Sequence, residues 1–309
     1  MHVAVMGSGG TGGFFGGLLA RAGERVAFIA RGAHLEAMRA HGLRVKSRLA
    51  GNFTLPVTAT DDPREIGPVD LILFCVKTYD TEAALGRILP LVGPETVVLS
   101  VQNGIDNAGR IARVVGPDPV VGAVAHVFSA IEAPGVIAQA AGPGRIILGE
   151  LAGGTSPRTE RIVSMFRHAG IVAELSRDIR VTLWEKFLFI CGNGGVTALT
   201  RLPLGLIRAC PETNALLRGT MEEVEAVARA KGIALPEACI EQVVAFNASV
   251  EPEARSSLYY DLVGGRRLEV DALHGTVVRL GREHGVPTPF NFAIYAALKP
   301  YADGAPGPA

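Results

Sequence analysis

The chain has 309 residues, which is long enough for two domains of ordinary size, each with its own hydrophobic core. Hydrophobic residues make up 48% of the chain and charged residues 19%, a balance that is typical of a folded globular protein and excludes a disordered one. The 30 lysines and arginines equal the 30 aspartates and glutamates, so there is no basic excess for binding nucleic acid or an anionic membrane.

The four cysteines lie far apart and form no C-x-x-C pair, which favours reduced thiols in a cytoplasmic protein: Cys75, Cys191, Cys210 and Cys239. The first expected strand begins at residue 2, which leaves no room for a signal peptide. No stretch approaches 18 uninterrupted apolar residues. We therefore expect a soluble cytoplasmic protein with no membrane partner.

The N-terminal stretch carries the clearest motif. Residues 2–6 are mostly apolar and suit a buried parallel strand, and a helical pattern follows up to Ala22. Between them the glycines have the G-x-G-x-x-G spacing of a dinucleotide-binding turn, in which the backbone and the helix N-terminus approach a pyrophosphate. The alternative is a structural turn in a chain with 38 glycines. We expect the cofactor to contact every residue of this turn: Gly7, Ser8, Gly9, Gly10, Thr11 and Gly12.

The second expected strand, residues 25–30, ends next to Arg31. An enzyme specific for NAD would place a carboxylate there, on the ribose 2′-hydroxyl group. No Asp or Glu occupies that place, and the planar guanidinium of Arg31 suits a 2′-phosphate. The sequence therefore predicts NADP(H) as the cofactor, unless Arg31 is an ordinary solvated arginine.

Strands and helices then alternate along the chain. Strands are expected at residues 70–76, 96–101, 120–127 and 171–175, and helices at 33–41, 79–91 and 157–169. This alternation predicts a parallel sheet with helices on both faces, a Rossmann-type domain. The remaining β-rich segments look like an inserted hairpin, residues 43–47 and 53–60, and an antiparallel extension, residues 135–140 and 145–151.

Two polar residues follow core strands of this sheet. Lys77 comes directly after the strand at 70–76, and Asn103 follows the strand at 96–101. Ligands bind at the carboxyl ends of the strands in open α/β sheets, so both are candidates for contact with cofactor or substrate. The alternatives are a solvated lysine that opens a helix and an Asn-Gly turn.

From Asp178 the pattern changes to helices only, expected at residues 181–192, 204–208, 212–231, 236–246 and 267–284. We therefore expect an NADP-binding Rossmann-type domain at residues 1–177 and an all-α domain for substrate binding and catalysis at residues 178–309. The fold class is α/β with this helical addition. The apolar helical domain could also support a homodimer.

Taken in this order, the motifs resemble the ketopantoate reductase family, whose members reduce 2-dehydropantoate to pantoate with NADPH. The resemblance covers essentially the whole chain. Besides the motifs above, it rests on Gln102-Asn103-Gly104, on Trp184-Glu185-Lys186, and on Ser257 twelve residues before Glu269. It implies an NADP-dependent oxidoreductase of pantothenate biosynthesis.

The resemblance also implies roles for single residues. Lys186 matches the catalytic lysine, a general acid that protonates the alkoxide as hydride arrives at C2, and an ammonium group suits that task because it is charged at neutral pH. Glu269 matches a glutamate that contacts the ribose or the substrate end of the site. Ser257 matches a substrate-binding serine, and Asn103 an asparagine between cofactor and substrate. From the residues alone, Glu269 could be a boundary glutamate and Ser257 an N-cap.

One segment departs from the family pattern. Family members commonly carry substrate-binding asparagines four and eight residues after the lysine, where this chain has Ile190 and Gly194. Asn193 returns to within about 20° of Lys186 around a helix and could take over one contact with the substrate. Glycines on both sides of Asn193 each cost a helix about 1 kcal/mol, so we expect a distorted turn.

Three functions remain open at this point. The first is NADPH-dependent reduction of ketopantoate, and the second is the same chemistry on another branched 2-oxo acid, which Ile190 suggests. The third is a non-catalytic NADP(H)-binding sensor, but a sensor has no need of a general acid such as Lys186. His126 and His274 lack partners at the spacing of metal ligands, so no metal is expected.

Overall fold

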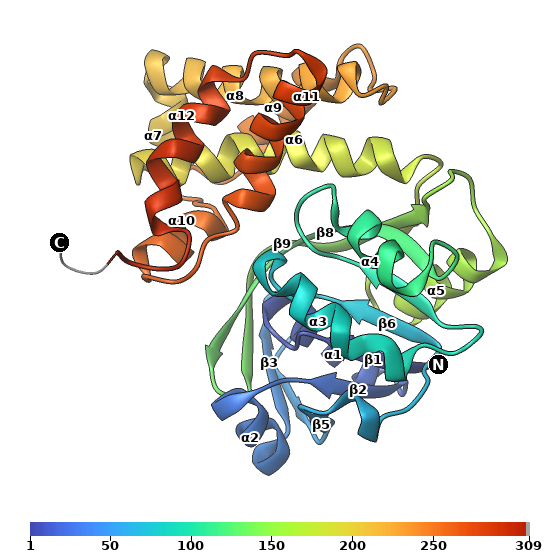
Figure 1. Cartoon of the computed structure of the whole chain (residues 1–309). Helices are drawn as coiled ribbons and strands as arrows, with labels where there is room; N and C mark the ends of the chain where they lie inside the picture. Colours follow the sequence, from blue (N-terminus) through green and yellow to red (C-terminus); the bar gives the residue numbers. More distant parts are fainter. Residues whose placement is uncertain (307–309) are drawn as a thin grey trace. The chain divides into compact units, whose positions relative to one another are not determined.

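The structure is a computed structural model and describes residues 1–306. The chain divides into two compact units (Figure 1). The first comprises Met1–Gln102 and Asp106–Arg180, and the second comprises Asn103–Ile105 and Val181–Ala309.

The first unit is built on one ten-stranded sheet, in the order β4-β3-β9-β8-β7-β6-β1-β2-β5, with β10 paired to β9. Its central strands pair in parallel, as the alternating pattern predicts. They are β2 (Arg25–Ile29), β1 (His2–Met6), β6 (Leu71–Phe74), β7 (Val97–Ser100) and the beginning of β8 (Val120–Ala133). This confirms the α/β fold class with a Rossmann-type sheet.

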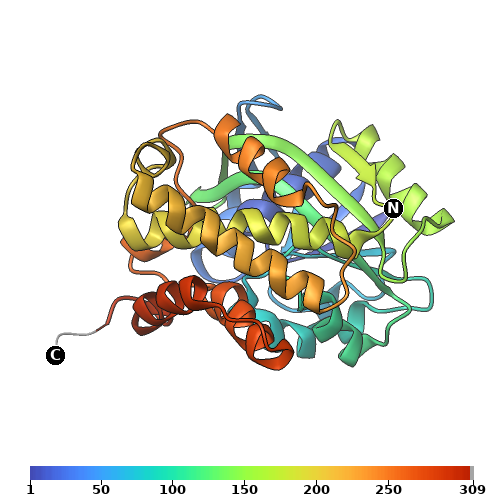
Figure 2. The ribbon, with the colours of Figure 1, turned by 90° about the horizontal axis from the view of Figure 1, so that it is seen from above.

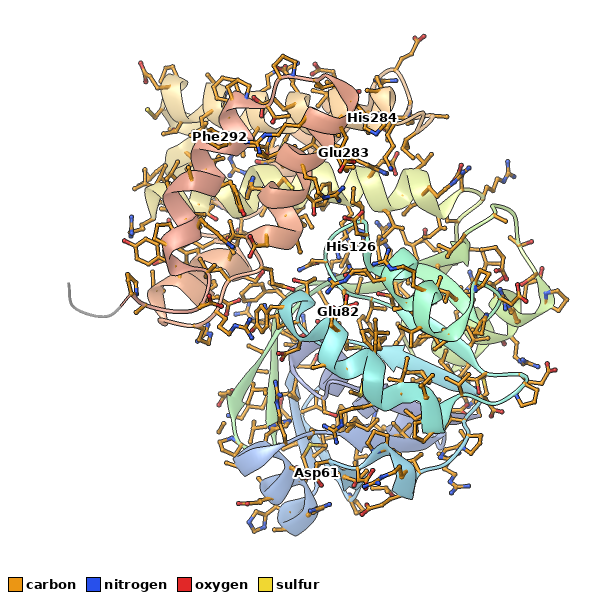
Figure 3. All side chains as sticks on the ribbon, in the orientation of Figure 1. Asp61, Glu82, His126, Glu283, His284 and Phe292 are labelled. Atoms are coloured by element: carbon orange, nitrogen blue, oxygen red, sulfur yellow. The ribbon has the colours of Figure 1, made fainter. Side chains whose placement is uncertain are left out.

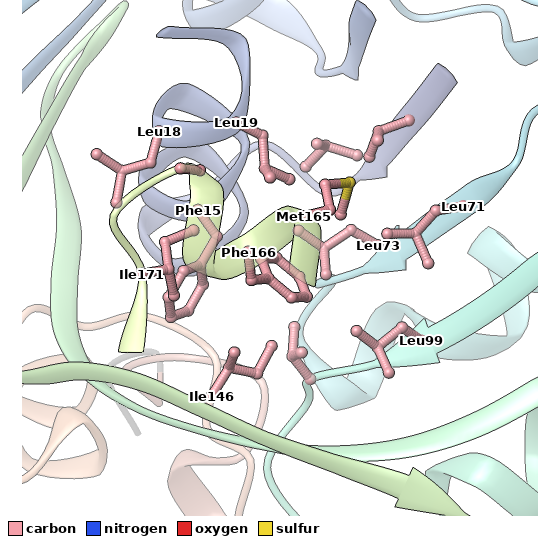
Figure 4. Close-up of a cluster of buried hydrophobic side chains, with 14 of the residues drawn as sticks. Phe15, Leu18, Leu19, Leu71, Leu73, Leu99, Ile146, Met165, Phe166 and Ile171 are labelled. Carbon is pink, nitrogen blue, oxygen red and sulfur yellow. The ribbon is translucent and has the colours of Figure 1, made fainter. Parts of the chain in front are cut away.

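Helices cover both faces of this sheet. Alternate residues of β6 enter two separate cores, because successive side chains of a strand point to opposite faces. Leu71 and Leu73 pack with α1 (Gly10–Arg21) and α5 (Pro157–His168), where the rings of Phe15 and Phe166 lie 6.5 Å apart, edge to face (Figure 4). Burial of each such side chain contributes about 1.5–3 kcal/mol.

The opposite face of the sheet packs against α3 (Thr81–Ile88) and α4 (Asn107–Val115), through Leu85 and Ile111 among others. Glu82 of α3, labelled in Figure 3, accepts a hydrogen bond from Arg110 Nε of α4 at 3.0 Å. The remaining helix of the first unit, α2 (Gly32–His41), follows β2.

Two predictions about the outer strands were partly wrong. The expected extension is antiparallel to β8, as predicted, but it is one long strand, β9 (Val136–Glu150), and not two segments at residues 135–140 and 145–151. The pairing instead jumps from Ala141–Phe128 to Arg145–His126, so the extra residues are absorbed as an irregularity in the ladder.

The second correction concerns the predicted hairpin. β3 (Leu43–Ser47) and β4 (Phe53–Leu55) do form one, but β5 (Thr58–Thr60) pairs in parallel with β2. Pro56 separates β4 from β5, and a proline lacks the N–H that would continue the ladder. The last strand, β10 (Val172–Leu175), pairs in parallel with β9.

The second unit is helical. Its longest element is α6 (Ile179–Thr200), drawn as the long yellow helix in Figure 2. The others are α7 (Leu204–Ala209), α8 (Pro211–Ala230), α9 (Cys239–Ser249), α10 (Ser257–Val263), α11 (Thr276–His284) and α12 (Pro289–Leu298). Their common core includes Phe187 and Leu188 of α6, Met221 of α8 and Ile240 of α9. Through residue 306, the structure contains no helix that is both long and apolar enough to cross a membrane.

The structure corrects the predicted helices at four places. α6 continues as a regular helix through its glycines to Thr200, so the expected distorted turn is absent. α10 and α12 were not predicted. The helix expected at residues 267–284 is instead a π-helical turn, η4 (Asp271–Gly275), followed by α11. At α10 and α12 local signals were overlooked, since Ser256 caps the former and a proline opens the latter.

Candidate active site

The turn from β1 to α1 has the backbone geometry of a dinucleotide-binding turn. Gly7 adopts φ of +97°, a conformation that residues with a side chain rarely adopt. A Cβ atom on Gly12 would lie 2.2 Å from the Gly7 carbonyl oxygen and 2.9 Å from Val5 Cγ1, so its absence lets α1 lie close to β1. At Gly9, no atom lies within 4 Å of the place where a Cβ would be. The backbone at Gly9 therefore borders open space.

The start of α1 favours an anion. The helix has no side-chain cap and no acidic residue in its first turn, and the first N–H groups of a helix have no partner within it. These N–H groups and the helix dipole attract negative charge. Thr11 is half-buried in this first turn.

Two residues of the predicted turn have evident packing roles. A Cβ atom on Gly10 would lie 2.0 Å from the carbonyl oxygen of Ser129. The hydroxyl of Ser8, 3% exposed, donates to the Ile29 carbonyl at 3.0 Å and so connects the turn to β2. The side chain of Ser8 is therefore engaged within the protein.

Arg31 directly precedes α2 at the end of β2, and its side chain is 79% exposed. Its Nη2 atom donates to Asp80 Oδ2 at 2.6 Å. A guanidinium has five N–H donors, so this ion pair leaves others for a further anion. The sequence did not reveal Asp80 as a partner, because 49 residues separate the two.

Lys77 and Asn103 follow β6 and β7, as predicted, and both are half-buried. Lys77 precedes the short 3-10 turn η2 (Thr78–Asp80) in the first unit, whereas Asn103 groups with the second unit. At the end of β7, Gln102 Nε2 donates to the Val76 carbonyl and to Thr81 Oγ1, each at 2.9 Å. These bonds hold together the segments that follow the two strands.

Lys186 and Glu269 interact electrostatically in the second unit. Lys186 lies half-buried on α6, beside the buried Trp184 and Phe187. Removal from water lowers the pKa of Lys186 to about 8, and the negative charge of Glu269 acts in the opposite direction. Glu269 is only 6% exposed and precedes η4. The arrangement suits an ammonium group that can release its proton near neutral pH.

Asn193 lies buried on α6, about two turns beyond Lys186 and on the same side of the helix. Thr197 Oγ1 donates to the Asn193 carbonyl at 2.6 Å and lies 2.7 Å from Ser256 Oγ. Ser256 caps α10 by accepting from the N–H of Tyr259 at 3.0 Å. Ser257 is therefore the first residue of α10 rather than its cap, and these bonds join that end of α10 to α6 near Asn193.

Sequence reasoning missed Asn247 of α9, which lies against Asn193. Asn247 Nδ2 donates to Asn193 Oδ1, and both side chains are at least 95% buried. The other amide atoms of the pair, Asn193 Nδ2 and Asn247 Oδ1, have no hydrogen-bond partner in the described part of the chain. No local motif signals this contact, because 54 residues separate the asparagines.

His274 has a structural environment. Its Nδ1 atom lies 2.8 Å from Asn291 Oδ1, and Asn291 Nδ2 in turn donates to Glu223 Oε2 at 2.7 Å. Burial lowers the pKa of His274 to about 4, so the ring is neutral at pH 7. Residues 1–306 contain no cluster of three or more His, Cys, Asp or Glu side chains that could hold a metal ion.

Comparison with known proteins matches both units to family models. Residues 3–153 match "Ketopantoate reductase PanE/ApbA", and residues 178–302 match "Ketopantoate reductase PanE/ApbA C terminal". The 2-dehydropantoate 2-reductase of Halobacterium salinarum is 35% identical over 94% of this chain and 95% of that protein. The one of Mesorhizobium japonicum is 32% identical over 97% of each chain.

Solved structures give the same result. The crystal structure of a PanE/ApbA family ketopantoate reductase from Ralstonia eutropha is 34% identical, covers 98% of each chain and superposes with a TM-score of 0.90. A 2-dehydropantoate 2-reductase from Geobacter metallireducens, also 34% identical, has a TM-score of 0.90 over 97% of this chain and 99% of that one. Because the family models and these relatives span nearly all of both chains, this protein belongs to the ketopantoate reductase family.

Proposed function

We propose that this protein reduces 2-dehydropantoate (ketopantoate) to pantoate with NADPH, a step of pantothenate biosynthesis. The observation that carries the proposal is the environment of Lys186. Burial lowers the pKa of this lysine to about 8, and the negative charge of Glu269 acts in the opposite direction. A non-catalytic sensor would have no use for a proton donor held in this way. The names of the relatives, 2-dehydropantoate 2-reductases, supply the substrate.

The first unit fits a dinucleotide. The open space at Gly9 and the uncapped N-terminus of α1 suit a pyrophosphate, and the exposed Arg31 suits a 2′-phosphate. In this proposal residues 1–177 bind the cofactor through Gly7–Gly12, Arg31 and Lys77, with Asn103 and Glu269 as further contacts. Bound NADPH would supply the hydride.

The chain's own part in the chemistry is the proton. Lys186 Nζ would donate a hydrogen bond to the C2 oxygen of the substrate and transfer that proton as negative charge develops on the oxygen. Glu269 favours the protonated form of Lys186 by its charge, so the proton is present near neutral pH. General acid catalysis of this kind contributes roughly 10²–10⁴-fold to a rate.

Residues 178–309 would hold the substrate as well as the acid. Asn193 and Ser257 are the proposed substrate contacts from the helices, together with Asn103 before α4. The hydrogen bonds of Thr197 connect α6 at Asn193 to Ser256 at the start of α10, so two of the proposed contacts come from neighbouring elements.

A second candidate is reduction of another branched 2-oxo acid. A Cβ atom on the buried Gly194 would meet only Leu258 Cδ2, at 4.0 Å, and the half-buried side chain at position 190 is apolar. In the related family pattern both positions carry asparagine. The wall of the site near α6 is therefore roomier and less polar than that pattern implies.

Turnover of NADPH with a small panel of 2-oxo acids separates these functions. We expect the highest kcat/KM with ketopantoate. Higher values with a bulkier branched acid would favour the second candidate, and NADPH binding without turnover of any acid would indicate a sensor. Lys186→Ala is the matched variant, because it should retain the fold and lose turnover.

The cellular setting is part of the proposal. The four cysteines are free, which fits reduced thiols in the cytoplasm.

A homodimer is also part of the proposal. Phe290 and Phe292 of α12, the latter labelled in Figure 3, are 42% and 49% exposed, and a second copy could cover this apolar surface. Light scattering of the purified protein and of Phe292→Ser measures the assembly state.

A further inference from the structure

The buried contact between α6 and α9 is incomplete in its hydrogen bonding. Asn193 and Asn247 share one hydrogen bond, from Asn247 Nδ2 to Asn193 Oδ1. Their exposed fractions are 5% and 2%, yet Asn193 Nδ2 and Asn247 Oδ1 have no partner in the described residues. Buried amide groups are nearly always paired, so an unpaired donor and an unpaired acceptor in one pair need an explanation.

The result does not depend on how the two amides are oriented. If both amide groups were turned over, Asn193 would donate to Asn247, and the free atoms would be one oxygen and one NH₂ group again. In either arrangement the pair presents one donor and one acceptor. A hydroxyl group is the complement of such a pair, because it both accepts and donates.

We propose that Asn193 and Asn247 together bind a hydroxyl group of the 2-oxo acid substrate, one amide donating to its oxygen and the other accepting its hydrogen. This inference rests on the proposed function, and it adds Asn247 of α9 as a specificity-determining residue. The pair would also supply polar contacts that are missing at positions 190 and 194, where the family pattern has asparagine and this chain has no polar side chain.

The spacing along α6 relates this pair to Lys186. Asn193 follows Lys186 by two helical turns on the same side of α6, about 10 Å along the axis. A short oxo acid with a hydrogen bond at each end spans a comparable length. The backbone beside Asn193 is open at Gly194, where the nearest atom to an added Cβ is Leu258 Cδ2 at 4.0 Å.

Side-chain hydrogen bonds fix the backbone at both asparagines. Thr197 Oγ1 donates to the carbonyl of Asn193 at 2.6 Å. Arg208 Nη1 donates to the carbonyls of Asn247 and Val250, at 2.5 and 3.0 Å, which fixes the end of α9. A preorganised pair can discriminate for a hydroxyl, because a substrate that lacks the group leaves two buried polar atoms unpaired.

The test compares ketopantoate with its analogue that lacks the 4-hydroxyl group, using kcat/KM for each. The key variant is the double substitution Asn193→Leu with Asn247→Leu, since replacing both partners by apolar groups of similar size leaves no unpaired amide and can be neutral for folding. Gln242→Leu, on the exposed side of α9, is the control.

We expect wild type and Gln242→Leu to prefer ketopantoate by at least about tenfold, and the folded double variant to prefer it by less than about threefold. Asn247→Ser, a smaller change, should also reduce the preference and serves if the double variant does not fold. An unchanged preference in the folded variants would show that the hydroxyl is bound elsewhere. Equal wild-type activity on both acids would overturn this inference alone, whereas no activity on either would overturn the proposed function with it.

Discussion

At the scale of single residues, the proposed chemistry depends on two opposing effects on the pKa of Lys186. Burial disfavours its charged form, and the carboxylate of Glu269 favours it, with the outcome that the pKa is lowered to about 8. An acid works best when its pKa lies near the operating pH, because it is then protonated and still able to give up the proton. Through its negative charge, Glu269 therefore raises the pKa of the proposed acid.

The pH dependence of the reaction should show this balance. Lys186 must be protonated to act as an acid, so kcat/KM should be highest below pH 8 and fall about tenfold per pH unit above it. Glu269→Gln removes the charge that raises the pKa of Lys186, so its basic limb should move to lower pH. Rate profiles from pH 6 to about 10 measure both.

Glu269→Asp is the matched control, because it keeps the negative charge and should keep the limb closer to its wild-type position. A wild-type limb near the ordinary lysine value of about 10.4 would contradict the lowered pKa. If Glu269→Gln left the basic limb of the pH profile unchanged, Glu269 would not influence the pKa of Lys186, whatever its effect on KM.

At the scale of elements, α6 shows that glycines close together in a helix can be required by packing at some positions and not at others. A Cβ on Gly192 would lie 2.4 Å from Met221 Cε, and one on Gly195 would lie 2.5 Å from the ring of His274. At Gly194 the nearest atom would be 4.0 Å away. Neighbouring side chains thus require two of these glycines, and packing does not require the third.

Alanine substitutions should separate these cases. Gly194→Ala should raise the free energy of unfolding by about 0.5–1 kcal/mol, because alanine favours a helix over glycine and meets no clash. Gly195→Ala should lower it by about 1–3 kcal/mol through overpacking against His274, and Gly192→Ala by less where Met221 can move. Urea denaturation of the three variants measures this. A destabilised Gly194→Ala would mean that the space beside it is not open.

The same helix shows what could be predicted from sequence. The start of α6 could be predicted, because Trp184 and Phe187 belong to an apolar helical pattern around Lys186, the residue that the family resemblance identifies. Its end could not be predicted, since the glycines argue against a helix and the packing of Met221 and His274 against Gly192 and Gly195 is visible only in the structure. Local rules count the cost of a glycine but not the side chain that fills its place.

The limits are similar elsewhere. The glycine turn at Gly7 and the parallel core were predictable because motif, strand and helix follow each other directly in the chain. The contacts Arg31–Asp80 and Asn193–Asn247, in contrast, join residues 49 and 54 positions apart. No pattern in a single sequence specifies such pairs, so the partner of each predicted residue became visible only in the folded chain.

At the scale of the whole molecule, the proposed tasks are divided between the two units of the chain. The glycine turn and Arg31 belong to the first unit, and Lys186 with Glu269 to the second. Cofactor binding and proton donation should therefore be separable by mutation. A ligand that binds only the folded state stabilises it by about 2.7 kcal/mol at a concentration of 100 times Kd, so binding can be measured without turnover.

Thermal unfolding with NADPH or NADH applies this to two variants. Arg31→Ala should lose most of the NADPH-induced rise in Tm, because a charge-assisted contact to phosphate is worth roughly 1.5–3 kcal/mol, about ten- to a hundredfold in Kd. The NADH-induced rise in Tm should be the same in this variant as in wild type. In wild type, NADPH should bind at least about tenfold more tightly than NADH. Lys186→Ala should keep the full NADPH response while kcat falls by roughly two to four decades. If NADPH and NADH stabilised the wild type equally, Arg31 would not bind a 2′-phosphate. Near-normal turnover by Lys186→Ala would mean that the proton comes from another group, and the division of tasks between the units would be wrong.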